Sequence, residues 1–494
     1  MSMIEINHLT FAYEGNYDNV FEDLTLRLDT SWRLGLVGRN GRGKTTLLRL
    51  LAGELSGGRA VRTGVSARYF PAPVRRPDRM TLEVLGELCP AAEDWEIIRE
   101  LSLLDVEIEA LYRPFSSLSG GEQTRALLSV LFLDEGAFPL IDEPTNHLDE
   151  AGRQTVAAYL KRQRGFLLVS HDRAFLDGCV DHILALEKTG VRVQAGNYSA
   201  WWADTQRRTA WEAQRDAQLK REIGQLRDAA RRTGDWSEKV EKTKNAGATD
   251  SGLKADKGRV GHMAAKMMRR SKAIEARRLS AAEEKENLLR NVEEAEPLKL
   301  RPLTFQGPRL LELREAAPVY GGRPVCPPVS FTLAPGERVA LTGPNGCGKT
   351  SLLKLLLGEE LDHTGEVLRP ARLTVSYLPQ DTSFLRGSLE EAMEMWEVDP
   401  VLCRAILRKL GLERRQFEKD LSGYSAGQKK KVLLARSLCQ SAHLYVWDEP
   451  LNYIDLWSRQ QVEELILEYR PTLIFVEHDR AFREKVATRT VELG

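Results

Sequence analysis

Three sequence motifs occur twice in this chain at an almost constant spacing. The run GRNGRGKTTLL at 38–48 returns as GPNGCGKTSLL at 343–353, LIDEPTNHLD at 140–149 returns as VWDEPLNYID at 446–455, and VSHDRAFL at 169–176 returns as VEHDRAFR at 476–483. The offset stays between 305 and 307 residues. One offset over three separated motifs indicates a duplicated domain. We expect the first copy to span residues 1–203, the second to span 305–494, and residues 204–304 to belong to neither.

The 494-residue chain is too long for one hydrophobic core, so two or three domains are expected. Its longest apolar runs have the length of strands, whereas a membrane-spanning helix needs about 18–20 apolar residues. The first residues carry neither a basic segment nor an apolar one, so no secretory signal is expected. The six cysteines are scattered without a CxxC pair, which is typical of reduced thiols rather than of a disulfide framework or a zinc site. We therefore expect a cytoplasmic protein.

Each copy contains a glycine-rich loop of the form GxxxxGK[ST]. The glycines let successive backbone N–H groups point at phosphate oxygens, the lysine reaches the terminal phosphates, and the hydroxyl residue after it ligates Mg²⁺. The N-terminus of the following helix adds its partial positive charge. The predicted phosphate-binding residues are Gly38, Asn40, Gly41, Gly43, Lys44, Thr45 and Thr46 in the first copy and Gly343, Asn345, Gly346, Gly348, Lys349, Thr350 and Ser351 in the second.

An apolar strand that ends in two acidic residues follows in each copy, as FPLIDE and LYVWDE. A buried strand that ends in aspartate places this carboxylate beside the phosphate-binding loop, where it holds Mg²⁺ through water. The metal-binding residues predicted in this way are Asp142, Asp448, Thr45 and Thr350. Glu143 and Glu449 come next and are placed to orient and deprotonate the attacking water. The alternative is a turn with solvated acids, but the pattern DEPxNxxD occurs twice.

Between the loop and the acid pair, each copy has a small-residue turn that opens a helix: SSLSGGEQT at 116–124 and GYSAGQKKK at 423–431. The backbone N–H groups of such a turn form a second anion site. Taken alone, the turn is an ordinary helix cap, but its position in both copies favours the anion site. The residues concerned are Ser119, Gly120, Gly121, Glu122, Ser425, Ala426, Gly427 and Gln428.

The order of phosphate-binding loop, signature turn, acid pair, NxxD loop and histidine resembles an ABC-type ATPase, present twice. The resemblance implies that the two domains close head to tail, so that ATP and Mg²⁺ lie between the loop of one and the signature turn of the other. One site would combine Lys44, Thr45, Asp142, Glu143 and His171 with Ser425, Gly427 and Gln428. The other would combine Lys349, Thr350, Asp448, Glu449 and His478 with Ser119, Gly121 and Glu122.

The same resemblance implies catalytic roles for His171 and His478 and base stacking by Tyr13 and Tyr320. Two positions depart from the family pattern. YLPQ carries the expected metal-site residue Gln380, whereas its counterpart YFPA has Ala72. The second signature turn has Ala426 where glycine is usual, and alanine is costly there if the turn requires a positive φ. We therefore expect two active but unequal sites.

The segment between the copies has the composition of a helical hairpin. Residues 205–245 and 263–296 are rich in Ala, Arg, Glu, Lys and Gln, which favours helix, and a run with several glycines at 245–261 breaks it. Arms of roughly 34–40 residues would reach about 50–60 Å. From 231 to 278 there are fourteen Lys and Arg against six Asp and Glu, so the positive charge gathers at the far end of the hairpin.

This concentration of charge suits a polyanion. The RNA-binding residues that we predict are Lys254, Lys257, Arg259, Lys266, Arg269, Arg270 and Lys272. Three methionines (Met263, Met267 and Met268) add adaptable apolar surface or, alternatively, form the core of a coiled coil. The alternative for the whole segment is a solvated coiled-coil linker.

Two ABC modules joined by a basic helical hairpin, with no membrane segment, resemble the ABC-F family over essentially the whole chain. The resemblance implies an α/β fold, with two ABC-type P-loop ATPase domains in tandem joined by a long α-helical hairpin linker. GYSAGQKKKVLLARSL, DEPLNYID, FPLIDEPTNHLD and GNYSAWW are similar to the antibiotic-resistance branch of Lsa and Vga type. Members of the family bind the E site of the ribosome, and their hairpin reaches the P-site tRNA and the peptidyl-transferase centre.

The resemblance implies a monomer whose two ABC domains pair with each other and which binds the 70S ribosome at the E site, next to 23S rRNA and P-site tRNA. The preferred function is ATP-dependent protection of the peptidyl-transferase centre, by displacing lincosamides, pleuromutilins and streptogramins A. A second possibility is a translation factor that rescues stalled ribosomes without any drug role. A third is the ATPase subunit of a membrane exporter. The hairpin argues against the third, because such a subunit needs coupling grooves rather than a long projection.

Overall fold

The computed structural model describes residues 3–13, 19–56, 61–134, 136–146, 148–187, 190–245, 273–274, 276–277, 280 and 298–493. The chain divides into two compact units. Met1–Trp201 and Glu296–Gly494 together form the first unit, and Trp202–Ala295 form the second. The first unit contains both copies of the repeated domain.

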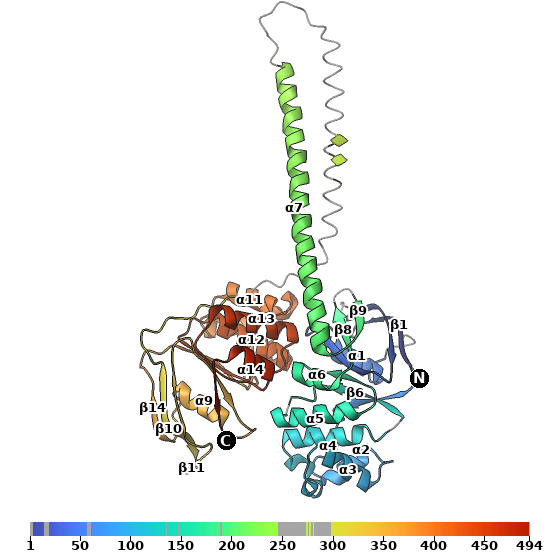
Figure 1. Cartoon of the computed structure of the whole chain (residues 1–494), viewed down its shortest axis with the longest axis vertical. Helices are drawn as coiled ribbons and strands as arrows, with labels where there is room; N and C mark the ends of the chain where they lie inside the picture. The colour runs from blue at the N-terminus through green and yellow to red at the C-terminus, as the bar shows by residue number, and fades with distance from the viewer. Residues whose placement is uncertain are drawn as a thin grey trace, which may run out of the picture. The chain divides into compact units, whose positions relative to one another are not determined.

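A six-stranded sheet forms the centre of the first domain (Figure 1). In spatial order its strands are β5 (Ser66–Phe70), β6 (Ala137–Asp142), β7 (Phe166–Val169), β3 (Arg33–Gly38), β8 (His182–Glu187) and β9 (Gly190–Ala195). Neighbouring strands run parallel except β8 and β9. All four residues of β7 are buried, as expected for a parallel strand covered on both faces.

An antiparallel sheet and the helices α1 to α6 belong to the described residues of the first domain as well. The sheet consists of β2 (Phe21–Asp29), β1 (Met3–Phe11) and β4 (Val61–Thr63) in that order. The helices are α1 (Lys44–Leu51), α2 (Thr81–Leu88), α3 (Asp94–Leu103), α4 (Gly120–Leu131), α5 (Glu150–Arg162) and α6 (Arg173–Cys179). Buried leucines of β1, β2, α1 and the central strands form one continuous core, which fixes α1 and the loop before it against the sheet.

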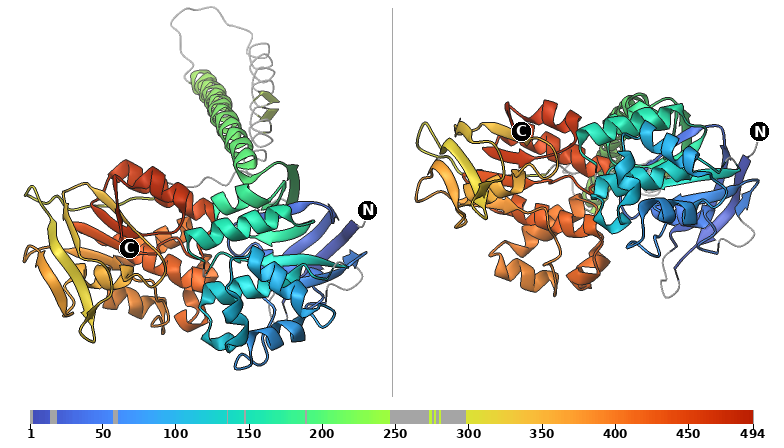
Figure 2. Two further views of the ribbon diagram at one scale, coloured as in Figure 1. Left: turned by 60° about the horizontal axis from the view of Figure 1, so that its bottom comes forward. Right: turned by 90° about the horizontal axis from the view of Figure 1, so that it is seen from below.

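The second domain repeats this plan. Its central sheet is parallel throughout, with the order β15 (Val375–Leu378), β16 (Leu444–Asp448), β17 (Leu473–Val476), β13 (Arg338–Thr342) and β18 (Arg489–Glu492). Its antiparallel sheet contains β11 (Arg323–Pro324), β10 (Leu311–Tyr320), β12 (Val329–Leu333) and β14 (His363–Leu368). In both views of Figure 2, these yellow strands lie on the side of the domain away from its red helices.

The helices of the second domain are α9 (Lys349–Leu357), α10 (Leu389–Met395), α11 (Pro400–Lys409), α12 (Ala426–Cys439), α13 (Leu456–Tyr469) and α14 (Arg480–Val486). Of these, α14 packs against α6 of the first domain. The two domains therefore share a contact within the first compact unit.

Helix α7 spans Tyr198–Asn245, a length of 48 residues, or about 72 Å at 1.5 Å per residue. Its described residues reach Asn245, and the helix begins seven residues before the predicted arm at 205. The early start has a local cause: Oδ1 of Asn197 accepts a hydrogen bond from the backbone N–H of Ala200 at 3.1 Å, as a helix cap does. The returning arm is helical at 273–274, 276–277 and 280.

In the part of the chain that the structure describes, no helix combines the length and the apolar character needed to cross a bilayer.

Candidate functional site

Each glycine-rich loop connects a central strand to a helix, because β3 runs into α1 and β13 runs into α9. Gly43 and Gly348 stand at the N-caps of these helices with φ of 85° and 91°. A Cβ atom on Gly43 would lie 2.6 Å from Cγ1 of Val20 and 2.8 Å from the ring of Phe21. Both the left-handed backbone and the close approach therefore require glycine at this position.

The loop lysines fold back into their own loops. Nζ of Lys44 donates a hydrogen bond to the carbonyl oxygen of Gly38 at 2.7 Å. Nζ of Lys349 donates to the carbonyl oxygens of Gly343 at 2.9 Å and Pro344 at 2.7 Å. Burial lowers the pKa of Lys44, against the opposing attraction of the Asp455 carboxylate. Each loop thus combines a central cation with a helix N-terminus, the charge distribution that an anionic phosphate requires.

The two glutamates of the acid pairs adopt the same strained backbone conformation. Glu143 and Glu449 follow directly after β6 and β16, with φ of 50° and 48°. The backbone N–H of Glu143 still donates to the carbonyl oxygen of Val169 at 2.9 Å, and that of Glu449 donates to Val476 at 3.0 Å. These bonds hold a conformation that costs about 1–3 kcal/mol for a non-glycine residue. Such strain, present in both copies, is typical of a functional position.

Each glutamate faces a histidine. Oε1 of Glu143 lies 3.3 Å from Nε2 of His171, and Oε1 of Glu449 lies 3.6 Å from Nε2 of His478. Burial, reinforced by the charge of the neighbouring Asp142, raises the pKa of Glu143 to about 8. Burial also opposes ionisation of Glu449, but the contact with His478 and nearby positive charge outweigh it and leave its pKa below the usual value. The pKa values of the two glutamates are therefore shifted in opposite directions.

The two aspartates of the acid pairs have different partners. Oδ2 of Asp448 accepts a hydrogen bond from the hydroxyl of Thr350 at 2.8 Å, and its Oδ1 is buried without a hydrogen-bond partner. Oδ2 of Asp142 instead accepts a hydrogen bond from the hydroxyl of Tyr69 at 2.9 Å, while Thr45 is exposed. A hydroxyl beside a carboxylate with a free acceptor atom is the kind of oxygen ligand set that Mg²⁺ prefers. The second copy therefore fits a magnesium ion.

The signature turns are helix caps with their side chains turned inward. Oγ of Ser119 accepts from the backbone N–H of Glu122, and Oγ of Ser425 accepts from that of Gln428, each at 3.3 Å. In return, Glu122 and Gln428 accept hydrogen bonds from the serine N–H groups at 2.7 and 3.0 Å. These are capping boxes, so both side chains are engaged with their own helix ends rather than directed at a ligand.

Ala426 does not have the positive φ that would make alanine costly in the signature turn. Ala426 is the first residue of α12, and it is not among the non-glycine residues with positive φ. Glycine is instead required at the next position, because a Cβ atom on Gly427 would lie 2.5 Å from the carbonyl oxygen of Tyr453. The crowding comes from a segment distant in sequence, which is why the motif alone did not indicate it.

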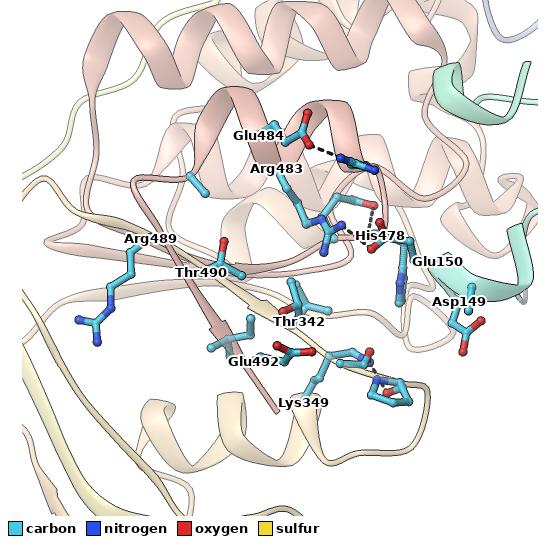
Figure 3. Close-up of a pocket in the computed structure, with 18 of the residues that line it drawn as sticks. Asp149, Glu150, Thr342, Lys349, His478, Arg483, Glu484, Arg489, Thr490 and Glu492 are labelled. Carbon is cyan, nitrogen blue, oxygen red and sulfur yellow. Dashed lines mark hydrogen bonds and ion pairs between the residues drawn. The ribbon is translucent and has the colours of Figure 1, made fainter. Parts of the chain in front are cut away.

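One cavity of about 660 Å³ brings the second phosphate-binding loop and the first signature turn together. The second domain contributes Gly346, Lys349, Thr350, Gln380, Glu449 and His478 to its wall. The first domain contributes Ser119, Gly120 and Gly121. Figure 3 shows a neighbouring cavity. Lys349 and His478 of the second domain line it together with Asp149 and Glu150 of the first domain.

The first phosphate-binding loop meets the second domain in the reciprocal arrangement. Nδ2 of Asn40 donates a hydrogen bond to the carbonyl oxygen of Tyr453 at 2.9 Å. The same Nδ2 atom lies 3.3 Å from the position that a Cβ atom would occupy on Gly427. A cavity of about 190 Å³ beside this contact is lined by the first loop together with Lys431 and Asp455 of the second domain. The two domains thus face each other head to tail.

The remaining predicted residues take varied positions. The hydroxyl of Tyr13 hydrogen-bonds that of Thr46 at 2.9 Å, and the Tyr13 side chain is 37% exposed. Tyr320 is exposed and ends β10. The predicted RNA-binding residues Lys254, Lys257, Arg259, Lys266, Arg269, Arg270 and Lys272 lie outside the described residues.

The buried charges that sequence reasoning missed in the second domain include Lys430 and Glu477. Lys430 donates to backbone oxygens beside the second acid pair. Oε1 of Glu477 accepts from the backbone N–H of His478 at 2.8 Å, and its Oε2 accepts from that of Leu451 at 3.1 Å. A comparison of the two copies could have found both residues. At the equivalent positions the first copy has Thr124 and Ser170, which carry no charge.

Two P-loops, each facing the signature turn of the other domain and each followed by an acid pair and a histidine, define a tandem ABC-type ATPase. The sequence model of the family described as "ABC transporter" matches residues 21–146 and 326–452. The chain belongs to this family of ATP-binding domains and is an ATPase.

Its relatives include members of the ABC-F group. The "Ribosome protection protein VmlR" of Bacillus subtilis (strain 168) is 29% identical over 494 residues, which cover 98% of this chain and 86% of the relative. The "ATP-binding protein Uup" of Caulobacter vibrioides is 31% identical over 498 residues, covering 96% and 74%. The "ABC transporter F family member 5" of Arabidopsis thaliana is 26% identical over 568 residues, covering 100% and 75%.

Solved structures share the tandem fold. An archaeal ribosome recycling factor, aABCE1, in complex with the archaeal ribosomal stalk protein aP1, aligns with a TM-score of 0.62 and 20% identity, covering 98% of this chain and 87% of the other. A protein described as "RNase-L Inhibitor" aligns with a TM-score of 0.59 and 21% identity, over the same shares. At this level of identity the likeness concerns the fold alone.

Proposed function

We propose that the chain hydrolyses ATP at two composite sites and uses this cycle to bind the ribosome and protect its peptidyl-transferase centre from antibiotics. The observation that carries the proposal is the alignment with the ribosome protection protein VmlR, which covers 98% of the chain. An alignment of this extent includes the segment between the ABC domains as well as the ATPase motifs.

At each site the loop lysine and the helix N-terminus bind the phosphates, and the signature turn of the other domain closes over them. Glu449 and Glu143 orient the attacking water and accept its proton, while His478 and His171 position these carboxylates. Thr350 and Asp448 would hold Mg²⁺ in the second site, and the ion when bound would supply positive charge against the phosphates. The predicted counterparts in the first site are Thr45, which is exposed, and Asp142, which accepts a hydrogen bond from Tyr69.

The two sites are unequal. In the second site, Glu449 has a pKa below its usual value and shares its cavity with Gln380. In the first site, Glu143 has a pKa of about 8, and the position of Gln380 is taken by Ala72. The second site thus has Gln380, Glu449 and His478 together, whereas the first lacks the glutamine, and we expect the two sites to hydrolyse ATP at different rates.

The hairpin carries the contact with RNA. Helix α7 is 48 residues long, and the stretch from 231 to 278 holds fourteen basic residues against six acidic ones. Such a charge excess binds nucleic acid through its phosphates. By resemblance to the ABC-F family, the protein acts in the cytoplasm as a monomer with paired domains, at the E site of the 70S ribosome, and its hairpin reaches 23S rRNA and P-site tRNA. Lincosamides, pleuromutilins and streptogramins A are the drugs that the resemblance implies.

Replacing both general bases tests the ATPase half of the proposal. The double variant Glu143→Gln and Glu449→Gln should bind ATP but lose turnover, because neither site then has a group that accepts the proton of water. With ATP it should remain on 70S ribosomes through sucrose-gradient centrifugation, whereas the wild type should dissociate. Near-wild-type hydrolysis by the double variant would show that these glutamates are not the bases.

Reversing the charge of the hairpin tests the RNA contact. The triple variant Lys266→Glu, Arg269→Glu and Arg270→Glu should keep the ATPase activity of the free protein but bind ribosomes more weakly, with a flatter dependence on salt. Shortening the glycine-containing segment at 245–261 should spare ribosome binding and lose drug protection. Unchanged ribosome binding by the triple variant across a salt series would identify the segment as a linker only.

Drug susceptibility separates the remaining possibilities. A sensitive bacterial host that expresses the chain should grow at higher lincosamide or pleuromutilin concentrations than a host that expresses the double Gln variant. Ribosome binding without a change in susceptibility would favour the translation factor that rescues stalled ribosomes. Co-purification with a membrane protein, in place of ribosomal RNA, would favour the exporter subunit.

A further inference from the structure

Lys430 is a fully buried lysine on the helix that the second signature turn opens. Its side chain is 2% exposed, and it lies on α12, which begins at Ala426. Nζ of Lys430 donates hydrogen bonds to the backbone carbonyl oxygens of Pro379 and Asp448, each at 2.9 Å. A buried ammonium requires such partners, so these two oxygens fix its place.

Both carbonyl groups belong to segments that shape the second ATP site. Pro379 directly precedes Gln380, and Asp448 directly precedes Glu449. Asp448, Glu449 and Glu477 surround the ammonium with negative charge, although burial lowers the pKa of Lys430 to about 8. One side chain thus ties the end of β15 to the end of β16.

The same helix also faces the first ATP site. Gly427, three residues before Lys430 and one turn away on α12, is the residue that approaches Asn40 of the first phosphate-binding loop. Asn40 in turn bonds to the carbonyl oxygen of Tyr453 at 2.9 Å. A shift of the N-terminus of α12, caused by opening or closing of the first site, therefore moves the backbone that carries Lys430.

The first domain lacks this connection at the equivalent position. Thr124 stands there, and its hydroxyl donates to the carbonyl oxygen of Gly120 on its own helix at 2.9 Å. Ser170 likewise replaces Glu477, and its hydroxyl lies 3.3 Å from that of Thr145. The bridge from signature helix to acid pair is thus built into one copy only.

We propose that Lys430 is a positioning residue for ATP hydrolysis at the second site, and that it transmits closure of the first site to the second through α12. The inference rests on the proposed roles of the ATP-site residues and is independent of ribosome binding. It predicts one-way control, in which nucleotide at the first site sets the rate at the second.

The first experiment measures each site separately in free protein. Glu143→Gln leaves the second site as the source of turnover, and Glu449→Gln leaves the first. Lys430→Met, added to Glu143→Gln, should lower kcat about tenfold or more, as misplaced catalytic groups do, with KM for ATP changed less than about threefold because the phosphate-binding loop is intact. Added to Glu449→Gln, it should change turnover less than about twofold. Equal losses in both backgrounds would mean a general structural role and overturn the proposal.

Two further variants keep the test decisive if Lys430→Met fails to fold. Lys430→Gln keeps an N–H donor group on a shorter, uncharged side chain and should show the same selective loss of kcat at the second site, to a smaller extent. The combination of Lys430→Met with Glu477→Gln removes the opposing charge but leaves both carbonyl oxygens without their donor, so the defect should persist. Recovery of turnover in this combination would show that Lys430 only balances charge. Lys429→Met is the matched control for loss of a neighbouring lysine.

The coupling itself is measured by a double-mutant cycle on total ATPase activity, which needs neither glutamine variant. Asn40→Ala removes the contact of the first loop with Tyr453. Its effect on turnover should be large with Lys430 present and at least about threefold smaller in Lys430→Met, because the residue that transmits it is gone. If Asn40→Ala and Lys430→Met reduced turnover by independent factors that simply multiply, the coupling would be refuted. The assignment of residues to the two ATP sites would stand.

Discussion

Gly427→Ala should separate the domains at the first site by adding a single methyl group. A Cβ atom at this position would lie 2.5 Å from the carbonyl oxygen of Tyr453 and 3.3 Å from Nδ2 of Asn40. Carbon–oxygen contacts in proteins are normally about 3.3 Å or longer, so the carbonyl group must move by roughly 0.8 Å. That carbonyl is the one that accepts the hydrogen bond of Asn40 at 2.9 Å, and the displacement lengthens and weakens it.

The size of the effect follows from the cost of overpacking. Adding a methyl group to a site without room costs about 1–3 kcal/mol, which lowers the population of the closed arrangement by a factor of roughly 5–150. Steady-state ATPase activity in the Glu449→Gln background reports the first site alone, and it should fall by a factor within this range.

Gly423→Ala is the matched control for this substitution. Gly423 lies four residues earlier and has nothing within 4 Å of the position of an added Cβ atom. Its variant should keep turnover within about twofold of the parent, since surface substitutions usually change stability by less than 0.5 kcal/mol. If Gly427→Ala also kept the turnover of its parent, the crowding argument would be wrong, and the glycine of the turn would serve another purpose.

Two further predictions concern stability. Lys431→Met should lower the free energy of unfolding by about 3–5 kcal/mol in urea denaturation, because it leaves the carboxylate of Asp455 buried and unpaired; the two groups are 2.7 Å apart and each side chain is 2% exposed. Adding Asp455→Leu should recover part of the loss, and a further loss would contradict this account. Glu143→Gln, without nucleotide, should raise the melting temperature relative to wild type more at pH 9 than at pH 5. Burial raises the pKa of this carboxyl to about 8, so wild-type stability from this group falls as the pH rises towards 8, and a difference independent of pH would exclude a raised pKa.

Local motifs were readable from the sequence because local geometry decides them. A glycine-rich loop between a strand and a helix has one conformation that presents its N–H groups, and the structure places Gly43 and Gly348 in it. The acid pairs end buried strands as the apolar runs predict. The start of α7 was misplaced, since the cap at Asn197 lies within a segment assigned to the first domain.

The expectation about Ala426 shows where such reasoning stops. The motif compares residue types at one position, whereas the steric demand falls on Gly427 and comes from Tyr453, 26 residues further along the chain. The motif likewise did not indicate the contact of Tyr69. Its hydroxyl donates a hydrogen bond to Asp142 in the first copy. No spacing rule predicts which side chain fills the space left by a neighbouring strand.

The sequence by itself determined that the chain carries two ABC-type ATPase domains, each with its own phosphate-binding lysine and acid pair. It did so because these groups are held by backbone segments that fold in the same way wherever the motif occurs. Only the tertiary structure decided that Asn40 meets Tyr453, that Lys430 bridges Pro379 and Asp448, and that the pKa values of the two buried glutamates shift in opposite directions. These features depend on which groups are buried next to one another, and burial and proximity are properties of the packed chain rather than of any segment of it.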